Sequence, residues 1–199
     1  MVNAEMVTIE TCVQVQPGFS IKGAVAHEAN GTHQVIMSKH LKPGEPYRYT
    51  KEHALRMTPA RSVENYRLEP GDILFMSRGI GNYAVLLEDI PRNAIASLTF
   101  FILRAKPGID PGYLAWCLNQ QPFQEQLSGV RTGAGTPMIP RKIFAELRIP
   151  LPPLEEQHKI ARLGNLLGQE QRLLRQLQDA TQLKQRLLGA RILRGQILL

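Results

Sequence analysis

The chain has 199 residues, of which 43% are hydrophobic and 21% are charged, and it carries a net charge of +7. This length suits one full domain with an appendage, and such a chain can bury a core without disulfides or metals. The N-terminal residues lack a secretory signal, and no apolar run is long enough to span a bilayer. Cys12 and Cys117 form no metal or redox motif, so we expect a reduced, cytoplasmic protein that contacts no membrane.

The excess of basic residues is compatible with binding to a nucleic acid, although it forms no polybasic tail. Residues 151–199 contain eight Lys or Arg residues against four Asp or Glu residues, and the remaining +3 is spread over the first 150 residues. Binding to a polyanion would therefore depend on the geometry of particular loops and not on charge alone.

The first 105 residues predict short strands separated by turns. Turn dipeptides occur at Asn30-Gly31, Pro43-Gly44 and Pro70-Gly71. Runs of apolar and β-branched residues lie between and after these turns, and such runs are typical of buried strands. The expected strands cover residues 32–37, 73–76, 83–87 and 95–103.

A helical segment follows at Asp110-Pro111, where aspartate is a favourable N-cap and proline fits the first helical turn. Apolar residues then recur at helical spacing from Tyr113 to Leu127, and Pro122 should end or kink this helix. Residues 129–140 form a polar, glycine-rich loop, residues 141–146 a short helix, and residues 147–151 a last strand. We therefore expect a mixed α+β domain over residues 1–150, with a largely antiparallel sheet.

The pattern changes at Pro153, and we expect one long helix within residues 151–199. Two glutamates follow this proline and complement the positive end of the helix dipole. Apolar residues then form two neighbouring stripes along the helix. Burying both stripes requires more than one neighbouring helix, or one such helix together with the domain itself. The first stripe contains Ile160, Leu163, Leu167, Leu174, Leu177 and Leu188, and the second contains Leu166, Leu173, Ala180 and Leu187. A continuous helix from residue 153 to 199 would be roughly 70 Å long, at about 1.5 Å per residue.

A second interpretation is a helix that folds back on its own domain. It would break at Gly164, Gly168 or Gly189. A glycine costs a helix only about 1 kcal/mol and often leaves it intact, so we favour the continuous helix.

Motifs of the common enzyme classes are absent from the sequence. The chain has no phosphate-binding P-loop, no serine-hydrolase elbow, no HExxH and no cysteine cluster. Residues 151–154, Leu-Pro-Pro-Leu, lack the polar and aromatic residues of the amino-methyltransferase tetrad. Four histidines between residues 27 and 53 have no partner at metal-ligand spacing, which favours scattered surface residues. We expect no catalytic residue, no metal and no cofactor in this chain.

Two loops have a composition that suits contact with a polyanion. The first, residues 77–82, combines glycines that allow close backbone approach with an arginine that can bind a phosphate or a guanine edge. The second, residues 131–136, combines small residues, hydroxyls and a cation. The candidate DNA-binding residues are Lys39, Ser77, Arg78, Asn82, Arg131, Thr132, Thr136, Arg141 and Lys142. Taken alone, a loop of this composition is more often an ordinary turn with a solvated arginine.

The order of these segments resembles the DNA-specificity subunit of type I restriction–modification systems. The sequence GDILFMSRG at residues 71–79 comes first, and DPGYL at residues 110–114 follows an apolar strand. The glycine- and threonine-rich loop comes next, and IPLPPLEEQHKIA at residues 149–161 leads into the long helix. This last motif is the most diagnostic, and the resemblance covers nearly the whole chain.

The resemblance implies a division of labour between the two parts of the chain. Residues 1–150 would be a target-recognition domain that reads one half of an interrupted DNA site, and residues 151–199 a spacer helix. In the family this unit usually occurs twice, and the two helices pack antiparallel as a coiled coil. The helices also dock methyltransferase subunits, which carry S-adenosylmethionine, in a complex that includes restriction subunits.

This sequence departs from the family pattern because it holds one recognition unit and one helix. It therefore resembles a half-subunit, which would pair with a second copy or a different half-subunit and read an interrupted palindrome. The loop after residue 76 is also short and lacks a threonine that often follows its glycine. The expected partner interface comprises Ile160, Leu163, Leu167, Leu174, Leu177 and Leu188. The alternatives are a coiled-coil scaffold with a protein-binding domain, or a nuclease or methyltransferase in its own right.

Overall fold

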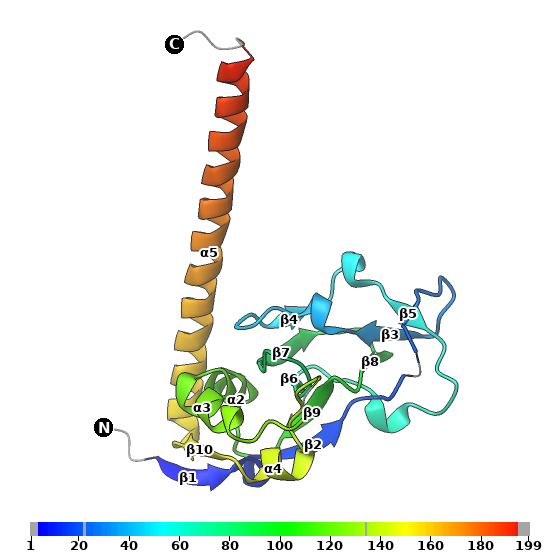
Figure 1. Cartoon of the computed structure of the whole chain (residues 1–199). Helices are drawn as coiled ribbons and strands as arrows, with labels where there is room; N and C mark the ends of the chain where they lie inside the picture. Colours follow the sequence, from blue (N-terminus) through cyan, green and yellow to red (C-terminus); the bar gives the residue numbers. More distant parts are fainter. Residues whose placement is uncertain (1–3, 22, 134, 195–199) are drawn as a thin grey trace.

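A five-stranded sheet forms the centre of the computed structural model, which describes residues 4–21, 23–133 and 135–194 (Figure 1). Its strands lie in the order β2, β9, β6, β7 and β4, and all neighbours are antiparallel except β4 and β7. Their bounds are Val13–Pro17 for β2, Phe100–Ala105 for β9, Ile73–Met76 for β6, Ala84–Asp89 for β7 and Tyr47–Arg48 for β4.

Two smaller sheets flank this central sheet. In the three-stranded sheet, β3 (His33–Ile36) pairs antiparallel with β5 (Arg56–Met57) and parallel with β8 (Ala94–Ala96). In the two-stranded sheet, β1 (Glu5–Thr8) pairs antiparallel with β10 (Arg148–Leu151). The short helical turns between strands are α1 (Ile9–Cys12), η1 (Ser38–His40), η2 (Lys51–His53) and η3 (Glu64–Tyr66).

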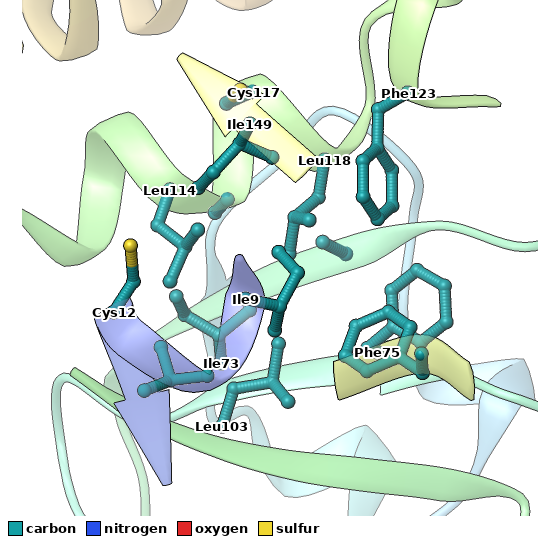
Figure 2. Packing of buried hydrophobic residues seen from close by; sticks show 14 of the residues in the cluster. Ile9, Cys12, Ile73, Phe75, Leu103, Leu114, Cys117, Leu118, Phe123 and Ile149 are labelled. Carbon is teal, nitrogen blue, oxygen red and sulfur yellow. The ribbon is translucent and has the colours of Figure 1, made fainter. Parts of the chain in front are cut away.

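The central strands are apolar throughout because both faces of the sheet are covered. Ile73 and Phe75 of β6 point into one core cluster, whereas Leu74 between them points into the other. The first cluster lies under helices α2 (Pro111–Leu118), α3 (Gln121–Ser128) and α4 (Arg141–Glu146), and Figure 2 shows Phe75, Leu114 and Leu118 within it. The rings of Phe75 and Phe144 have centroids 4.4 Å apart in this cluster. Double coverage explains the continuous apolar runs in the sequence.

The expected strand over residues 95–103 is wrong, because this segment forms β8 and β9 in two different sheets. A turn separates them, in which the Phe100 amide donates to the Ser97 carbonyl at 3.1 Å. The chain crosses between sheets at this point, where the backbone of Gly18 passes close to Ser97. A Cβ atom on Gly18 would lie 2.2 Å from the Ser97 oxygen.

The expected helices at residues 110–122 and 141–146 are present, with one difference. Asp110 caps α2, and its Oδ1 accepts a hydrogen bond from the Tyr113 amide at 2.6 Å. Pro122 does not kink this helix, since α2 ends at Leu118 and Pro122 lies in the first turn of α3. Proline fits there because the first helical amides have no acceptor within the helix.

Helix α5 (Leu154–Leu193) is continuous over its 40 residues and projects from one side of the domain (Figure 1). The interpretation in which glycine breaks fold it back on the domain is therefore wrong. None of the helices within the described ranges combines the length and apolar character that a membrane crossing needs. The mixed α+β architecture with a long C-terminal helix agrees with the expected fold class.

The base of α5 is fixed to the domain by Gln157, which is 1% exposed. Its Oε1 accepts from the Asp110 amide at 2.9 Å, and its Nε2 donates to the carbonyls of Pro152 at 2.9 Å and Gly108 at 3.3 Å. The glutamine of the Leu-Glu-Glu-Gln motif therefore links the first turn of α5 to the segment before α2.

Replacing Gln157 by leucine should lower the free energy of unfolding by about 3 kcal/mol. The change leaves one amide and two carbonyls without their partner, and each buried unsatisfied group costs about 1–3 kcal/mol. Urea denaturation of the variant measures this loss. Gln169→Leu, at an exposed position of the same helix, is the control and should change stability by less than about 0.5 kcal/mol. Equal stabilities for the two variants would contradict the anchoring role.

Candidate nucleic-acid interface

The two loops singled out in the sequence lie side by side in the structure. The Gly79 amide donates to the Pro137 carbonyl at 2.8 Å, and the Ile139 amide donates to the Ser77 carbonyl at 2.9 Å. An isolated β-bridge between Arg78 and Met138 joins them at the same point. We call residues 77–82 and the described part of 131–140 the reading loops. Their backbones form one surface, although 48 residues separate them in the sequence.

The second reading loop is closed on itself at its base. Backbone hydrogen bonds run in both directions between Thr132 and Met138, at 2.9 and 2.8 Å. Gly133 has a φ of +96°, in the left-handed region that favours glycine. A Cβ atom there would also lie 3.1 Å from the Thr136 carbonyl oxygen. Glycine is therefore required for this turn, which holds Thr132 and Thr136 exposed on its surface.

Asn82 holds the two reading loops together through its side chain. Its Nδ2 donates to the Met76 carbonyl at 2.8 Å, and its Oδ1 accepts from Nε of Arg131 at 2.9 Å. Arg131 is exposed, and this bond uses only one of the five N–H donors of its guanidinium. The asparagine thus orients an arginine whose terminal amino groups can bind a phosphate or a guanine edge.

Ser77 and Asn82 do not have the surface exposure that we expected of DNA contacts. Both are buried, at 2% and 7% exposure. The Ser77 hydroxyl donates to the Thr99 carbonyl at 3.1 Å, which ties the first reading loop to the start of β9. The hydrogen-bonding groups of both side chains bind partners within the protein. Their structural role is to support the exposed residues around them.

The remaining candidate residues are distributed over several elements. Arg78 is half-buried within the first reading loop. Arg141 and Lys142 are exposed in the first turn of α4, directly after the second loop, and Nη1 of Arg141 donates to the Val15 carbonyl at 3.4 Å. Lys39 is exposed on η1, which follows β3 of the three-stranded sheet. The structure thus groups the arginines and threonines of the two loops and places Lys39 on a separate element.

Ile80 is an exposed apolar residue at the tip of the first reading loop, and the candidate set omitted it. Its side chain is 87% exposed, and it lies between two glycines. Gly79 has a φ of +106°, and a Cβ atom there would lie 2.9 Å from Cε of Met76. The sequence signal was an apolar residue between two glycines in a loop expected to contact a polyanion. A stiff β-branched side chain is presented to solvent beside Arg78.

A polar cavity of about 610 Å³ lies between the domain and α5, and its lining mixes basic and acidic side chains, which are Lys42, Arg48, Arg172, Glu45, Glu52 and Glu88. His40, His53 and Tyr47 stack along it, with ring centroids 5.1 and 5.5 Å apart. Burial lowers the pKa of His40 to about 4 and raises the pKa of Tyr47 to about 12, so both are neutral at physiological pH. Across the described ranges, no group of three or more His, Cys, Asp or Glu residues could hold a metal ion.

Most leucines of the expected partner interface are open to solvent. Leu163, Leu167, Leu174, Leu177 and Leu188 are 40–65% exposed along α5. Ile160 differs, because it is half-buried against the core of its own domain. The second stripe is also open, with Leu166, Leu173 and Leu187 at 56–65% exposure. An exposed apolar surface of this length is typical of an unoccupied protein interface.

Comparison with known proteins gives one family match and several relatives. Residues 1–179 match the family model described as a type I restriction modification DNA specificity domain. The chain is 28% identical over 169 residues to the specificity subunit of the type I restriction enzyme MjaVIII from Methanocaldococcus jannaschii. That alignment covers 82% of this chain and 36% of the relative.

Solved structures share this fold. The S subunit of a type I restriction–modification system from M. genitalium matches with a TM-score of 0.55 and 17% identity, over 81% of this chain and 38% of that one. The HsdS subunit from Thermoanaerobacter tengcongensis matches with a TM-score of 0.58 and 20% identity, over 97% and 45%. A structure of a type I R-M system assembly matches with a TM-score of 0.69 and 20% identity, over 97% and 46%. The chain spans less than half the length of each of these relatives.

Proposed function

Because this chain belongs to the family of type I restriction–modification DNA specificity domains, we propose that it is a non-catalytic specificity subunit whose reading loops bind one half of an interrupted DNA site. The observation that carries this proposal is the pairing of the two loops. Direct backbone bonds join the loops on either side of Arg78, a backbone pair closes the second loop at Thr132, and the Asn82 side chain holds Arg131 beside them. Cations and hydroxyls on a rigid support suit both phosphate contact and base reading.

Different residues of this surface would make the phosphate contacts and the base contacts. Arg141 and Lys142 lie at the N-terminal end of α4, beside the second loop, and suit phosphate contacts that set the orientation on the duplex. Arg131 has a fixed Nε and free terminal donors, which suit two parallel hydrogen bonds to guanine. The Thr136 hydroxyl can donate to or accept from base edges, whereas the Thr132 hydroxyl donates to the Met138 carbonyl at 3.2 Å and can still accept.

We propose that α5 pairs antiparallel with the same helix of a second copy or of another half-subunit. The domain sits at the N-terminal end of α5, while the leucines continue to Leu193 at the other end (Figure 1). In an antiparallel pair, each distal half covers the proximal half of its partner, and the two domains lie at opposite ends. Two identical readers would then bind an interrupted palindrome, as two-fold symmetry requires.

The proposal includes partners that supply the chemistry. A methyltransferase subunit, carrying S-adenosylmethionine, and a restriction subunit would dock on the paired helices. The purified chain should therefore transfer no label from S-adenosylmethionine to DNA until a methyltransferase subunit is added. Methyl transfer by the chain alone would contradict the non-catalytic assignment.

Binding-site selection from random duplexes, together with light scattering, tests the whole proposal. We expect a dimer that selects two inverted half-sites around an unselected spacer. The affinity should fall steeply with salt, because phosphate contacts release counterions. A chain that binds no DNA at low salt would instead favour the scaffold interpretation, and a monomer that selects one uninterrupted site would refute the paired arrangement.

Replacing Ile80 by alanine should lower affinity for the selected duplex by about tenfold, because burial of an isoleucine side chain contributes about 1.5–3 kcal/mol. The proposed contact is the methyl group of a thymine, which an exposed apolar side chain can detect in the major groove. Anisotropy titrations with uracil in place of each thymine check this contact. The affinity of wild type should fall when uracil replaces thymine at one position, and the affinity of Ile80→Ala should not change at that position. Ile80→Val is the control and should retain most of the response; a full response in Ile80→Ala would refute the contact.

A further inference from the structure

Helix α5 contacts its own domain through Ile160, at the start of the first stripe, and through a second face that lies away from the leucines. This docking face consists of Gln157, Ala161, Gly164, Gly168 and Arg172, at intervals of three or four residues. On a helix with 3.6 residues per turn, these positions lie on the side away from both leucine stripes. A change in the docking face can therefore leave the surface proposed for helix pairing intact.

Two glycines of the docking face permit contacts that no other residue would allow. A Cβ atom on Gly164 would lie 2.3 Å from Cδ1 of Trp116 on α2, and one on Gly168 would lie 2.8 Å from the Gly44 carbonyl oxygen. Gly189, further along the same helix, has open space around its missing Cβ. Glycine is a poor helix former, so its presence at positions 164 and 168 is explained by close approach. The glycines that suggested breaks in the sequence are contact points.

Arg172 adds a third contact above the two glycines. Its Nη1 lies 3.5 Å from Oε2 of Glu45, which belongs to the turn that contains Gly44. The helix therefore rests on α2 near its base and on the 42–46 turn above it. Contacts at two separated supports restrict the tilt of the helix as well as its rotation. The distal part of α5 extends away from the domain (Figure 1).

We propose that the docking face fixes the angle between the recognition domain and α5, and thereby sets the number of base pairs between the two half-sites. This inference rests on the proposed function, because it assumes two readers at the ends of a helix pair. A domain of this size has a radius of gyration of roughly 15 Å. If the domain rotates by about 13° with a lever arm of this length, its far side moves by about 3.4 Å, which is the rise of one base pair. Small changes at this contact therefore alter the preferred spacing.

The test measures affinity for duplexes whose selected half-sites are separated in steps of one base pair. Wild type should show one optimum. Gly164→Ala forces Trp116 and α5 apart, so the optimal spacing of this variant should change. Its affinity at the original spacing should fall about 100-fold. Binding through two sites at once raises affinity by about 10²–10⁴-fold, and this gain is lost when the two sites cannot be occupied together. Gly189→Ala makes the same substitution in open space and should keep the wild-type profile.

A second substitution tests whether the contact itself is responsible. Trp116→Leu removes the ring that a Cβ at position 164 would meet, so Gly164→Ala combined with Trp116→Leu should return the optimum towards the wild-type spacing. Arg172→Ala provides a milder change at the upper support and should broaden the profile. Affinity for a single half-site and the dimer mass by light scattering should stay unchanged in every variant.

The outcomes separate this inference from the proposed function. If wild type has no spacing optimum, the proposed pair of readers is wrong and the inference fails with it. If wild type has a spacing optimum, and Gly164→Ala and Arg172→Ala show the same dependence of affinity on spacing, the docking face does not set the spacing. The proposed pair of recognition domains would be unaffected by that result. A shifted optimum that Trp116→Leu leaves unrestored would also overturn the assigned contact.

Discussion

Leu174→Glu is expected to weaken self-association of the chain by about 10²–10⁴-fold while leaving the recognition domain folded. Leu174 is 58% exposed on α5, two residues beyond the docking face. Burial of a leucine side chain contributes about 1.5–3 kcal/mol, and a symmetric dimer loses this contribution twice. A total of about 3–6 kcal/mol corresponds to the expected change, at about 1.4 kcal/mol for each tenfold step.

The position of Leu174 makes the substitution more severe in an antiparallel pair. The midpoint of α5, which runs from Leu154 to Leu193, falls between Leu173 and Leu174. In a pair that overlaps over its full length, the two-fold axis passes near this point, and each residue 174 approaches its own symmetry mate. Two glutamates would then meet as like charges in a partly desolvated contact. Parallel or shifted pairing would give a smaller effect.

Sedimentation velocity over a range of protein concentrations measures the dimer dissociation constant. Gln182→Glu is the matched control, because it adds the same charge about four helical turns beyond Gly168, on the side of the docking face. The control should dimerise like wild type, and both variants should show the same unfolding midpoint for the domain. A Leu174→Glu variant that remains fully dimeric would place the partner contact elsewhere.

The positions of the reading loops could be predicted from sequence, whereas their pairing could not. Glycine, proline and polar residues determine where a turn forms, and this information is local. The bond from the Gly79 amide to the Pro137 carbonyl instead depends on how α3 and α4 pack over the central sheet. The same limit applies to Asn82, because nothing in the adjacent residues indicates that Arg131 is its partner.

The boundary between β8 and β9 shows a second limit of sequence patterns. Residues 95–103 are apolar and β-branched without glycine or proline, so the pattern is the same for one long strand and for two. The turn at Ser97 is determined by the change from one sheet to another. Long helix α5 was predictable because its pattern extends over forty residues, and such long periodic signals are the most reliable.

The contacts that join the domain to α5 could not be predicted for a related reason. Gly164 and Gly168 suggested breaks, because glycine lowers helix propensity. Their contacts with Trp116 and Gly44 come from distant segments that local propensity does not include. The hydrogen bonds of Gln157 with Asp110 and Gly108 likewise join segments that lie far apart in the sequence.

Arg131→Ala is expected to lower affinity for the selected duplex by about 10–100-fold, because a direct arginine contact with guanine is worth about 1–3 kcal/mol. The two possible contacts predict different patterns. A base contact would relax selection at one position of each half-site. A phosphate contact would weaken all sequences equally and reduce the salt slope by about 1. Arg186→Ala, which removes the same charge from an exposed position of α5, is the control and should change affinity less than threefold.

A double-mutant cycle with Asn82 determines whether the arginine acts from its supported position. Asn82→Ala removes the acceptor of the Arg131 Nε bond without removing the charge, so it should weaken binding less than Arg131→Ala. In the double variant the loss should be smaller than the sum of the two, since Asn82 has no arginine left to orient. Strictly additive losses would mean that the asparagine supports only the loop backbone through Met76. The cycle thus separates a base-reading arginine held in a fixed geometry from a solvated charge near DNA.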